Sequence, residues 1–210
     1  MESPEADSPQ TCRLLEQARA GDRAAFEELF RAHRPQIRRF IDRRLDVRVR
    51  ARLDPSDVVQ DTQFQAFRRL DDYLRRRPMP FHIWLWKTAR ESLLKAHRRH
   101  LGAAQRAIGR ETHLPDASSW DLAERFVAGG CSPSQHLSRQ EVVRRVNQAL
   151  GELAEIDREV LTLRTFEGLS FSEIACVLEI EAVTARKRYG RALLRLRSAL
   201  LKSGLLEPEP

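Results

Sequence analysis

Cysteine is scarce in this chain, with three residues among 210, and no two of them form a Cys-x-x-Cys pair. A disulfide framework or a structural zinc site needs more thiols at closer spacing. Cys12, Cys131 and Cys176 are therefore expected to be reduced thiols, as is usual in the cytosol. His97 and His100 lie three residues apart on a predicted helix, but no cysteine or carboxylate cluster completes a metal site beside them.

Other features that would define a function are missing as well. The chain has no signal peptide and no apolar run long enough to cross a membrane. It has no glycine-rich phosphate loop, no nucleophile paired with a base, no internal repeat and no stretch with the alternation of a strand. These absences predict a soluble, cytoplasmic, all-α protein that is not an enzyme and holds no cofactor.

What the chain has in excess is basic charge. Lysine and arginine number 37 against 30 acidic residues, so the net charge is +7 and the pI is about 10.0. Arginine far outnumbers lysine, and its planar guanidinium can contact phosphates and base edges through two hydrogen bonds at once. This balance favours a polyanionic partner such as nucleic acid.

The strongest local pattern occupies residues 167–197. Ser170 and Glu173 have the spacing of a capping box, which predicts a helix that begins just after Ser170. A short turn at 179–181 separates it from a second helix, expected at about 182–200. A short capped helix, a tight turn and a long basic helix form a helix-turn-helix motif, whose second helix fits the major groove of DNA.

The second helix of this motif has two contrasting faces when its residues are placed at helical spacing. Its apolar face holds Ala185, Tyr189, Ala192, Leu193, Leu196 and Leu200. Its cationic face, the candidate for DNA contact, holds Thr184, Lys187, Arg188, Arg191 and Arg195. A basic helix face is more often solvated surface than a binding site. Here the capping box, the turn and the basic face occur together, and that combination favours DNA binding.

The N-terminal half is also helical by its periodicity. Residues 1–10 are expected to form a disordered tail, and apolar residues then recur at helical spacing over 11–44, with Pro35 able to kink or divide that helix. Asp54 and Pro55 start a further helix, expected to end at about residue 74. Its predicted core face holds Val59, Ala66, Phe67, Leu70 and Leu74.

A second face of the same helix carries Asp57, Gln60, Asp61 and Phe64, at spacings of three and four residues. One interpretation is that the two aspartates serve the positive end of the helix dipole and that Phe64 is an isolated surface residue. The other is a protein-binding patch, because such patches combine an aromatic side chain with polar neighbours on an exposed face.

A basic segment with two prolines, Arg75–Pro80, ends this helix. The next helix, expected at about 81–100, places Trp84, Glu91 and several cations on one face. Tryptophan among cations after a basic loop is typical of a site that stacks an unpaired base; the alternative is a structural Trp84 at the edge of the core. The candidate residues for single-stranded DNA are Arg76, Arg77, Trp84, Lys87, Lys95 and Arg98.

Helical periodicity is lost after this helix, and glycine, proline and serine recur, which predicts a linker at 105–137. Ser138 and Glu141 form another capping box, and a further helix is expected at about 157–166. The sequence thus predicts two small helical domains joined by a flexible linker.

These blocks, in this order, resemble a bacterial RNA polymerase sigma factor of the small extracytoplasmic-function (ECF) type within the sigma-70 family. The matching segments are DPSDVVQDTQFQAFRRL, PFHIWLWKTARESLLKAHRR and ALGELAEIDREVLTLRTFEGLSFSEIACVLEIEAVTARKRYGRALLRLR. The resemblance implies a region 2 domain at 11–104, the linker at 105–137, a region 4 helix-turn-helix domain at 138–202 and a tail at 203–210.

The resemblance also implies partners. The family binds core RNA polymerase through its β and β′ subunits and binds promoter DNA, both double-stranded and locally melted; an anti-sigma factor is a further possible partner. The implied function is to direct the polymerase to specific promoters and to help melt the −10 element.

Roles follow residue by residue from the resemblance. The polymerase-docking positions are those of Asp57, Gln60 and Asp61, on the face that also holds Phe64. The loop at 76–80 and the helix with Trp84, Lys87 and Arg98 occupy positions that capture the −10 element. The positions that face the −35 element are those of Thr184, Lys187, Arg188 and Arg191.

The chain departs from the family pattern at a few positions. Glu91 and Lys95 stand where Asn and Asp are common, so no preference among −10 sequences is implied. Glu179 replaces a glycine usual in the turn, which predicts backbone strain if this residue is left-handed. Ala154 stands where a proline often starts the first region 4 helix.

A different class of function would use the same motif. A stand-alone transcriptional regulator would bind duplex DNA unaided as a symmetric dimer, with the N-terminal half as a dimerisation or ligand domain. It would need neither the Asp57–Phe64 face nor the basic loop before Trp84. A DNA- or RNA-processing enzyme lacks any candidate active site in this sequence.

Overall fold

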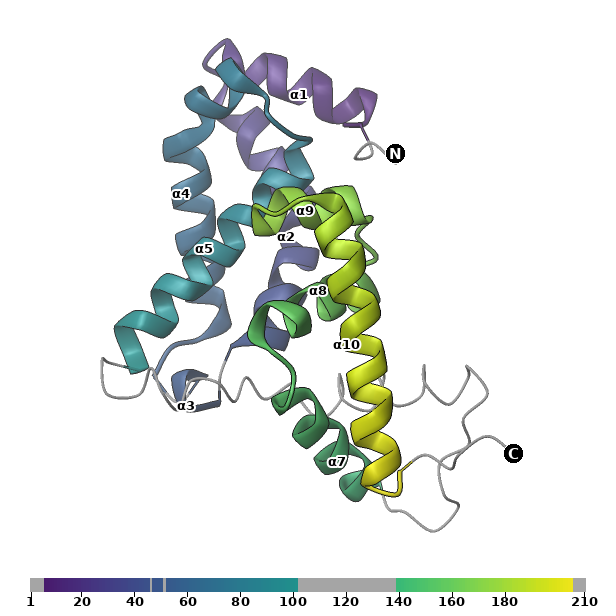
Figure 1. The fold of residues 1–210 in the computed structure, drawn as a ribbon. Helices are drawn as coiled ribbons and strands as arrows, with labels where there is room; N and C mark the ends of the chain where they lie inside the picture. The colour runs from purple at the N-terminus through teal and green to yellow at the C-terminus, as the bar shows by residue number, and fades with distance from the viewer. Residues whose placement is uncertain (1–5, 46, 51, 102–138, 206–210) are drawn as a thin grey trace. The chain divides into compact units, whose positions relative to one another are not determined.

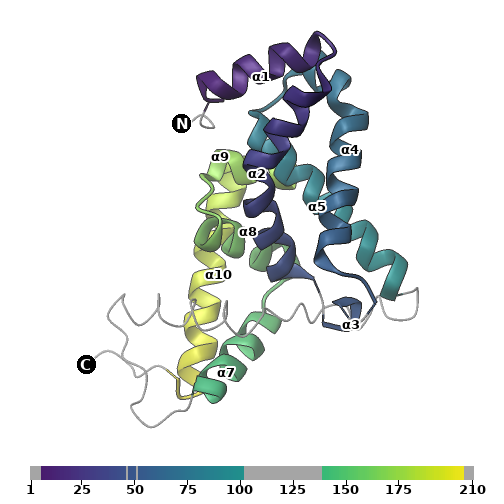
Figure 2. The ribbon, with the colours of Figure 1, turned by 180° about the vertical axis from the view of Figure 1, so that it is seen from behind.

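The computed structural model describes residues 6–45, 47–50, 52–101 and 139–205, and every regular element in these ranges is a helix. Their contacts form two compact units, an N-terminal one with α1 to α5 and a C-terminal one with α7, α8 and α10. Figures 1 and 2 show the helices of each unit from opposite sides. The predicted all-α fold with two helical domains is confirmed. The predicted linker and Cys131 lie outside the described residues.

The N-terminal unit is built on three long helices. Helix α2 packs against both α4 and α5, α4 packs against α5, and α1 packs against α2 (Figure 1). Helix α2 runs unbroken through Pro35, so this proline does not divide it. The helices of this unit are α1 (Pro9–Arg19), α2 (Arg23–Arg44), α3 (Val47–Arg50), α4 (Pro55–Arg76) and α5 (Phe81–Leu101).

Helix α1 begins inside the stretch predicted to be disordered. The hydroxyl of Ser8 accepts a hydrogen bond from the backbone N–H of Thr11 at 3.2 Å and so caps the helix. The carboxylate of Asp7 accepts a hydrogen bond of 2.7 Å from the backbone N–H of Phe81. The prediction of disorder is therefore wrong for residues 8–10, because composition reveals neither the cap nor this distant anchor.

The start of α4 agrees with the sequence prediction. The Asp54 carboxylate accepts a hydrogen bond from the Ser56 N–H at 2.6 Å, and the Asp57 carboxylate accepts one from the Asp54 N–H at 3.1 Å. The hydrogen bond from Ser56 is the main reason that the pKa of Asp54 lies below its usual value. This reciprocal pair satisfies backbone donors that have no partner within the helix.

One residue of the predicted α4 core face is misplaced. Phe67 is 41% exposed and lies over Phe26 of α2, with ring centroids 5.3 Å apart. Thr62 and Ala66, four residues apart on the same helix, are fully buried. Phe67 follows Ala66 by one position, about 100° around the helix, which carries it to the edge of the α2–α4 contact.

The C-terminal unit contains α7 (Arg139–Gly151), α8 (Glu155–Phe166) and α10 (Ala182–Lys202), and α9 (Phe171–Leu178) joins α8 to α10 in the chain. Helix α10 packs against α8 and α7. The predicted apolar face of α10 is confirmed: four of its residues are buried, and Tyr189 and Leu193 pack against them. The buried four are Ala185, Ala192, Leu196 and Leu200.

The predicted C-terminal tail begins later than expected. Gly204 adopts a φ of +70°, and the Leu205 N–H donates to the Leu200 carbonyl oxygen at 3.0 Å. This turn folds Leu205 into the core, where it is 2% exposed. The prediction of a tail is therefore wrong for residues 203–205.

The turn between α9 and α10 is left-handed at Glu179, which has a φ of +56°. The Ile180 N–H donates to the Ala175 carbonyl oxygen at 3.1 Å, the six-residue closure of a Schellman motif. A side chain with a Cβ is strained in this conformation, whereas glycine is not. The strain predicted for glutamate at this position is therefore present.

Replacing this residue by Glu179→Gly is expected to raise the free energy of unfolding by about 0.5–1 kcal/mol, because relief of left-handed strain outweighs the added freedom of the unfolded chain. The midpoint of urea unfolding measures the change. Glu181→Gly is the control, since Glu181 has an ordinary φ of −76° and its side chain makes no capping hydrogen bond. Equal effects of the two substitutions would contradict the assignment of strain to the turn.

Candidate nucleic-acid and partner interfaces

The predicted cationic face of α10 forms a continuous stripe. Arg188, Arg191 and Arg195 follow one another at spacings of three and four residues, so they lie on one side of the helix. Lys187, Arg191 and Arg195 are exposed, while Arg188 and Thr184 are half-buried. Lys187 makes no hydrogen bond or ion pair with another described residue, so its ammonium group is open to a ligand.

A buried carboxylate lies beneath this stripe. Asp157, in the first turn of α8, is 0% exposed and accepts a hydrogen bond from Nη1 of Arg188 at 2.8 Å. Nη1 of Arg195 and Nη1 of Arg191 lie 3.7 Å and 3.9 Å from Oδ2 of the same carboxylate. The sequence marks Asp157 only as a helix start, because nothing in its spacing connects it with residues 31 to 38 positions further along the chain.

The start of α9 is fixed by local bonds and by an aromatic contact. The predicted capping box is confirmed: the Ser170 N–H donates to the Glu173 carboxylate at 2.7 Å, and the Glu173 N–H donates to the Ser170 hydroxyl at 3.2 Å. The Phe171 ring meets the Tyr189 ring of α10 at 5.6 Å between centroids. The guanidinium of Arg186 lies 5.3 Å from the same ring. These contacts hold the first helix of the motif against the second.

The candidate partner-binding face on α4 is accessible. Asp57, Gln60, Asp61 and Phe64 are all exposed, and Phe64 is 57% exposed. Asp57 also takes part in the cap of α4, so the dipole interpretation holds for this residue. Asp61 makes no hydrogen bond or ion pair with another described residue. The guanidinium of Arg68 lies 5.6 Å from the Phe64 ring.

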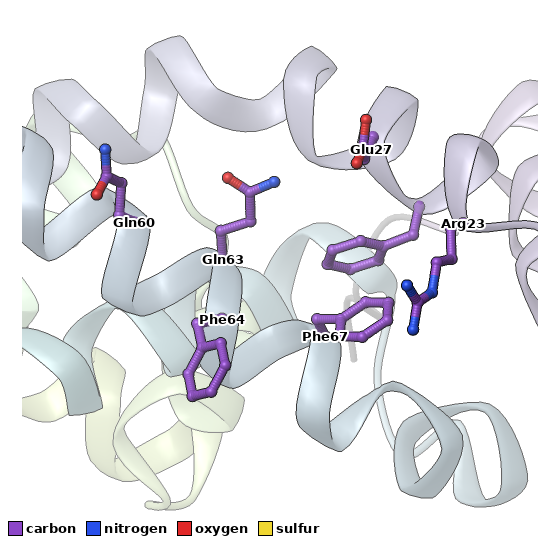
Figure 3. A pocket seen from close by; sticks show the side chains of 7 residues that line it. Arg23, Glu27, Gln60, Gln63, Phe64 and Phe67 are labelled. Carbon is purple, nitrogen blue, oxygen red and sulfur yellow. The ribbon is translucent and has the colours of Figure 1, made fainter.

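A pocket of about 340 Å³ adjoins this face (Figure 3). Gln63 extends from α4 toward α2, whereas Phe64 points away from that helix. Beside them the Phe67 ring is flanked by the Arg23 guanidinium at 5.5 Å. The pocket is lined by Arg23, Phe26, Glu27, Gln60, Gln63, Phe64 and Phe67.

Trp84 does not lie on the surface of the N-terminal unit. Trp84 is 8% exposed, and its ring is stacked on that of Tyr73, with centroids 4.6 Å apart and an interplanar angle of 25°. The ring centroid of Phe81 lies 5.8 Å from that of Trp84. The Tyr73 hydroxyl donates to the Met79 carbonyl oxygen at 3.1 Å, and burial raises the pKa of Tyr73. This geometry favours the structural alternative for Trp84 over direct stacking on a base.

Most of the basic residues predicted to contact single-stranded DNA are accessible. Arg76 and Arg77 are exposed at the end of α4, and Arg77 adopts a left-handed φ of +36°, which turns the chain into the loop. Lys95 and Arg98 are exposed on α5, and Lys87 on the same helix is half-buried. Arg76 and Arg77 thus lie at the loop, whereas Lys95 and Arg98 lie about 17 and 21 Å beyond Trp84 along α5.

In the part of the chain that the structure describes, no group of three or more histidine, cysteine or acidic side chains could hold a metal ion. Among the same residues, no helix is long and apolar enough to span a membrane.

Comparisons with known proteins match both units. The model of Sigma-70 region 2 matches residues 29–101, and that of Sigma-70 region 4 matches residues 144–196. ECF RNA polymerase sigma factor SigD of Mycobacterium tuberculosis is 31% identical over 191 residues, which cover 91% of this chain and 84% of that protein. RNA polymerase sigma-H factor of Pseudomonas aeruginosa is 31% identical over 192 residues, covering 89% and 92%.

Solved structures give the same result. CnrH in complex with the cytosolic domain of CnrY matches with a TM-score of 0.59 and 26% identity, over 92% of this chain and 98% of that chain. Sigma factor RpoE from Bartonella quintana, solved with the anti-sigma factor NepR, has the same fold at 19% identity and a TM-score of 0.51.

Two helical units, one of them carrying a helix-turn-helix with a basic second helix, define a DNA-binding protein of transcription. The chain belongs to the sigma-70 family, as an extracytoplasmic-function sigma factor. It is a subunit that binds core RNA polymerase and directs it to promoters. The stand-alone regulator is not favoured, because the N-terminal half matches sigma region 2 rather than a dimerisation or ligand domain.

Proposed function

We propose that three separate groups of residues perform different binding functions in this sigma factor. The face of α4 with Asp57, Gln60, Asp61 and Phe64 docks on core RNA polymerase. The basic loop and α5 hold the −10 element, and the cationic stripe of α10 reads the −35 element. The observation that carries this division is that each group has exposed members on a unit that matches the corresponding sigma region.

Docking through α4 rests on an exposed aromatic ring beside an unpaired carboxylate. Phe64 offers apolar area that is desolvated on binding, and Asp61 offers a charge that has no partner among the described residues. An anti-sigma factor would silence the protein by covering this face or by wedging between the two domains. The similarity to CnrH, which was solved with the cytosolic domain of CnrY, supports such a partner.

Capture of the −10 element rests on positive charge at the loop that follows α4 and along α5. Arg76, Arg77, Lys95 and Arg98 are exposed and can follow the backbone of a melted strand, and Lys87 adds a further cation on α5. Trp84 is buried, and its stacking on Tyr73 fixes the start of α5. The protein contributes binding energy and no chemistry of its own, and it acts in the cytoplasm, where core polymerase and promoters are found.

Recognition of the −35 element rests on α10. Base edges in the major groove are read by side chains that project from one face of such a helix, and phosphate contacts fix its register. Thr184, Lys187 and Arg191 are the residues of the stripe that we assign to this reading, with Arg195 placed further along the helix for the DNA backbone.

Replacing a reading residue by Arg191→Ala is expected to weaken binding to the preferred −35 sequence by about 1–3 kcal/mol, because a bidentate contact with a base edge is lost. The test measures holoenzyme affinity for promoters that the wild-type holoenzyme selects from randomised DNA. Arg144→Ala is the control, because it removes an equal charge from an exposed residue of α7. A loss that is uniform across all sequences would show that Arg191 contacts phosphate instead.

A further inference from the structure

The carboxylate beneath the stripe of α10 is unusually placed for an aspartate. Asp157 is 0% exposed, and it occupies the first turn of α8, where the helix dipole favours an anion. A buried charge is strongly unfavourable unless partners of opposite charge compensate it. All three partners come from α10: Arg188, Arg191 and Arg195.

The three arginines do not share this carboxylate equally. Only Arg188 forms a hydrogen bond, at 2.8 Å to Oδ1, and its side chain is 29% exposed. Oδ2 is buried and has no hydrogen-bond partner among the described residues. Arg191 and Arg195 lie 3.9 Å and 3.7 Å from it, and their side chains are 51% and 55% exposed.

This asymmetry separates the roles of the arginines. The hydrogen bond between Arg188 and Asp157 is short and shielded from solvent. We therefore assign Arg188 to anchoring the stripe and not to contacting DNA. Arg191 and Arg195 are drawn toward Oδ2 by charge alone, because their distances exceed those of a hydrogen bond. Their N–H groups form no hydrogen bond with Asp157, so they can bind a phosphate or a base edge without first breaking one.

We propose that Asp157 is a positioning residue for −35 recognition, which orients the arginines of α10 before DNA arrives. This role rests on the proposed function of α10. An arginine that is oriented before binding loses less rotamer freedom when it contacts a base edge in that orientation. A mismatched base that needs another orientation gains no such benefit, so discrimination between sequences increases. The same carboxylate adds one negative charge close to DNA and lowers affinity for any duplex. Asp157 therefore raises specificity while it lowers general affinity.

The two effects have opposite signs, so one substitution can separate positioning from simple support of the fold. Asp157→Asn keeps the shape of the side chain and removes its charge. Holoenzyme made from core polymerase and the full chain is measured on two duplexes: a promoter that the wild-type holoenzyme selects, and the same promoter with its −35 element scrambled. The ratio of the two dissociation constants is the −35 specificity.

For Asp157→Asn we expect this ratio to fall about tenfold, the order of one lost base contact. Affinity for the scrambled duplex stays the same or rises, because a negative charge near the phosphates is gone. Glu155→Gln is the control, since it removes an equal charge from the same turn of α8 and Glu155 contacts none of the three arginines; its ratio stays at the wild-type value. An equal loss on both duplexes, or a ratio within about twofold of wild type, would overturn the role.

A double variant keeps the test decisive if Asp157→Asn lowers the thermal midpoint. Asp157→Asn with Arg188→Gln removes both members of the 2.8 Å pair, so neither charge is left buried alone. Because Asp157 orients Arg191 and Arg195 through Oδ2, the double variant should have a lower ratio than Arg188→Gln alone; equal ratios for these two variants would contradict the proposal. A wild-type holoenzyme with equal affinity for the two duplexes would instead contradict the proposed function of α10 itself.

Discussion

Asp61→Arg is expected to abolish the complex with core RNA polymerase while the protein stays folded. Asp61 is exposed in the second turn of α4 and has no partner among the described residues, so its replacement should change stability by less than about 0.5 kcal/mol. In the complex, the new arginine side chain would face a polymerase surface that complements the Asp61 carboxylate. Like charges brought together in this way cost several kcal/mol of affinity.

Co-elution with core polymerase on size exclusion measures this effect, and circular dichroism checks the helical content. Glu16→Arg is the matched control: it makes the same charge change on an exposed residue of α1, outside the Asp57–Phe64 face of α4. The control should co-elute as the wild type does. If Asp61→Arg also binds with unchanged affinity and native helical content, α4 does not dock through this face.

Leu196→Ala is expected to destabilise the C-terminal unit by about 2–5 kcal/mol, because it empties the centre of a small core. Leu196 is 0% exposed and packs with Leu161 and Leu200 in the cluster that joins α10 to α7 and α8. The described part of this unit spans only residues 139–205, and a domain of this size has little stability to lose. Recognition of the −35 element should therefore be lost.

Leu194→Ala supplies a control of the same chemistry on the same helix. Leu194 is 72% exposed, so its truncation leaves no cavity and should change the free energy of unfolding by less than about 0.5 kcal/mol. Chemical unfolding of the full chain measures both variants, and co-elution with core polymerase should survive in both, because docking is assigned to α4. Similar losses of stability for the two leucines would contradict the packing of α10.

Local bonds made the helix starts predictable. The caps of α4 and α9 depend on residues no more than three positions apart, so spacing alone reveals them. The apolar face of α10 was also predictable, because one stripe of Ala185, Leu196 and their neighbours covers a single core. Comparison with the family pattern identified Glu179 as a position that would be strained if it were left-handed, and its φ is +56°.

Contacts between distant segments account for the features that the sequence did not reveal. Trp84 is covered by Tyr73, and Phe67 is displaced to an edge, because the surfaces of other helices determine which positions are central. Asp157 meets its arginines only after α8 and α10 pack together, 31 residues apart at the closest pair. Helical periodicity shows which face of a helix is apolar, but it does not show which charged residue from a distant segment will contact that helix.

Size exclusion of the purified protein mixed with bacterial core RNA polymerase tests whether this chain acts as a polymerase subunit. We expect a stoichiometric complex that binds promoter DNA, with little promoter binding by the free protein. Absence of a complex, together with tight binding of duplex DNA by a dimer of this chain, would contradict this expectation.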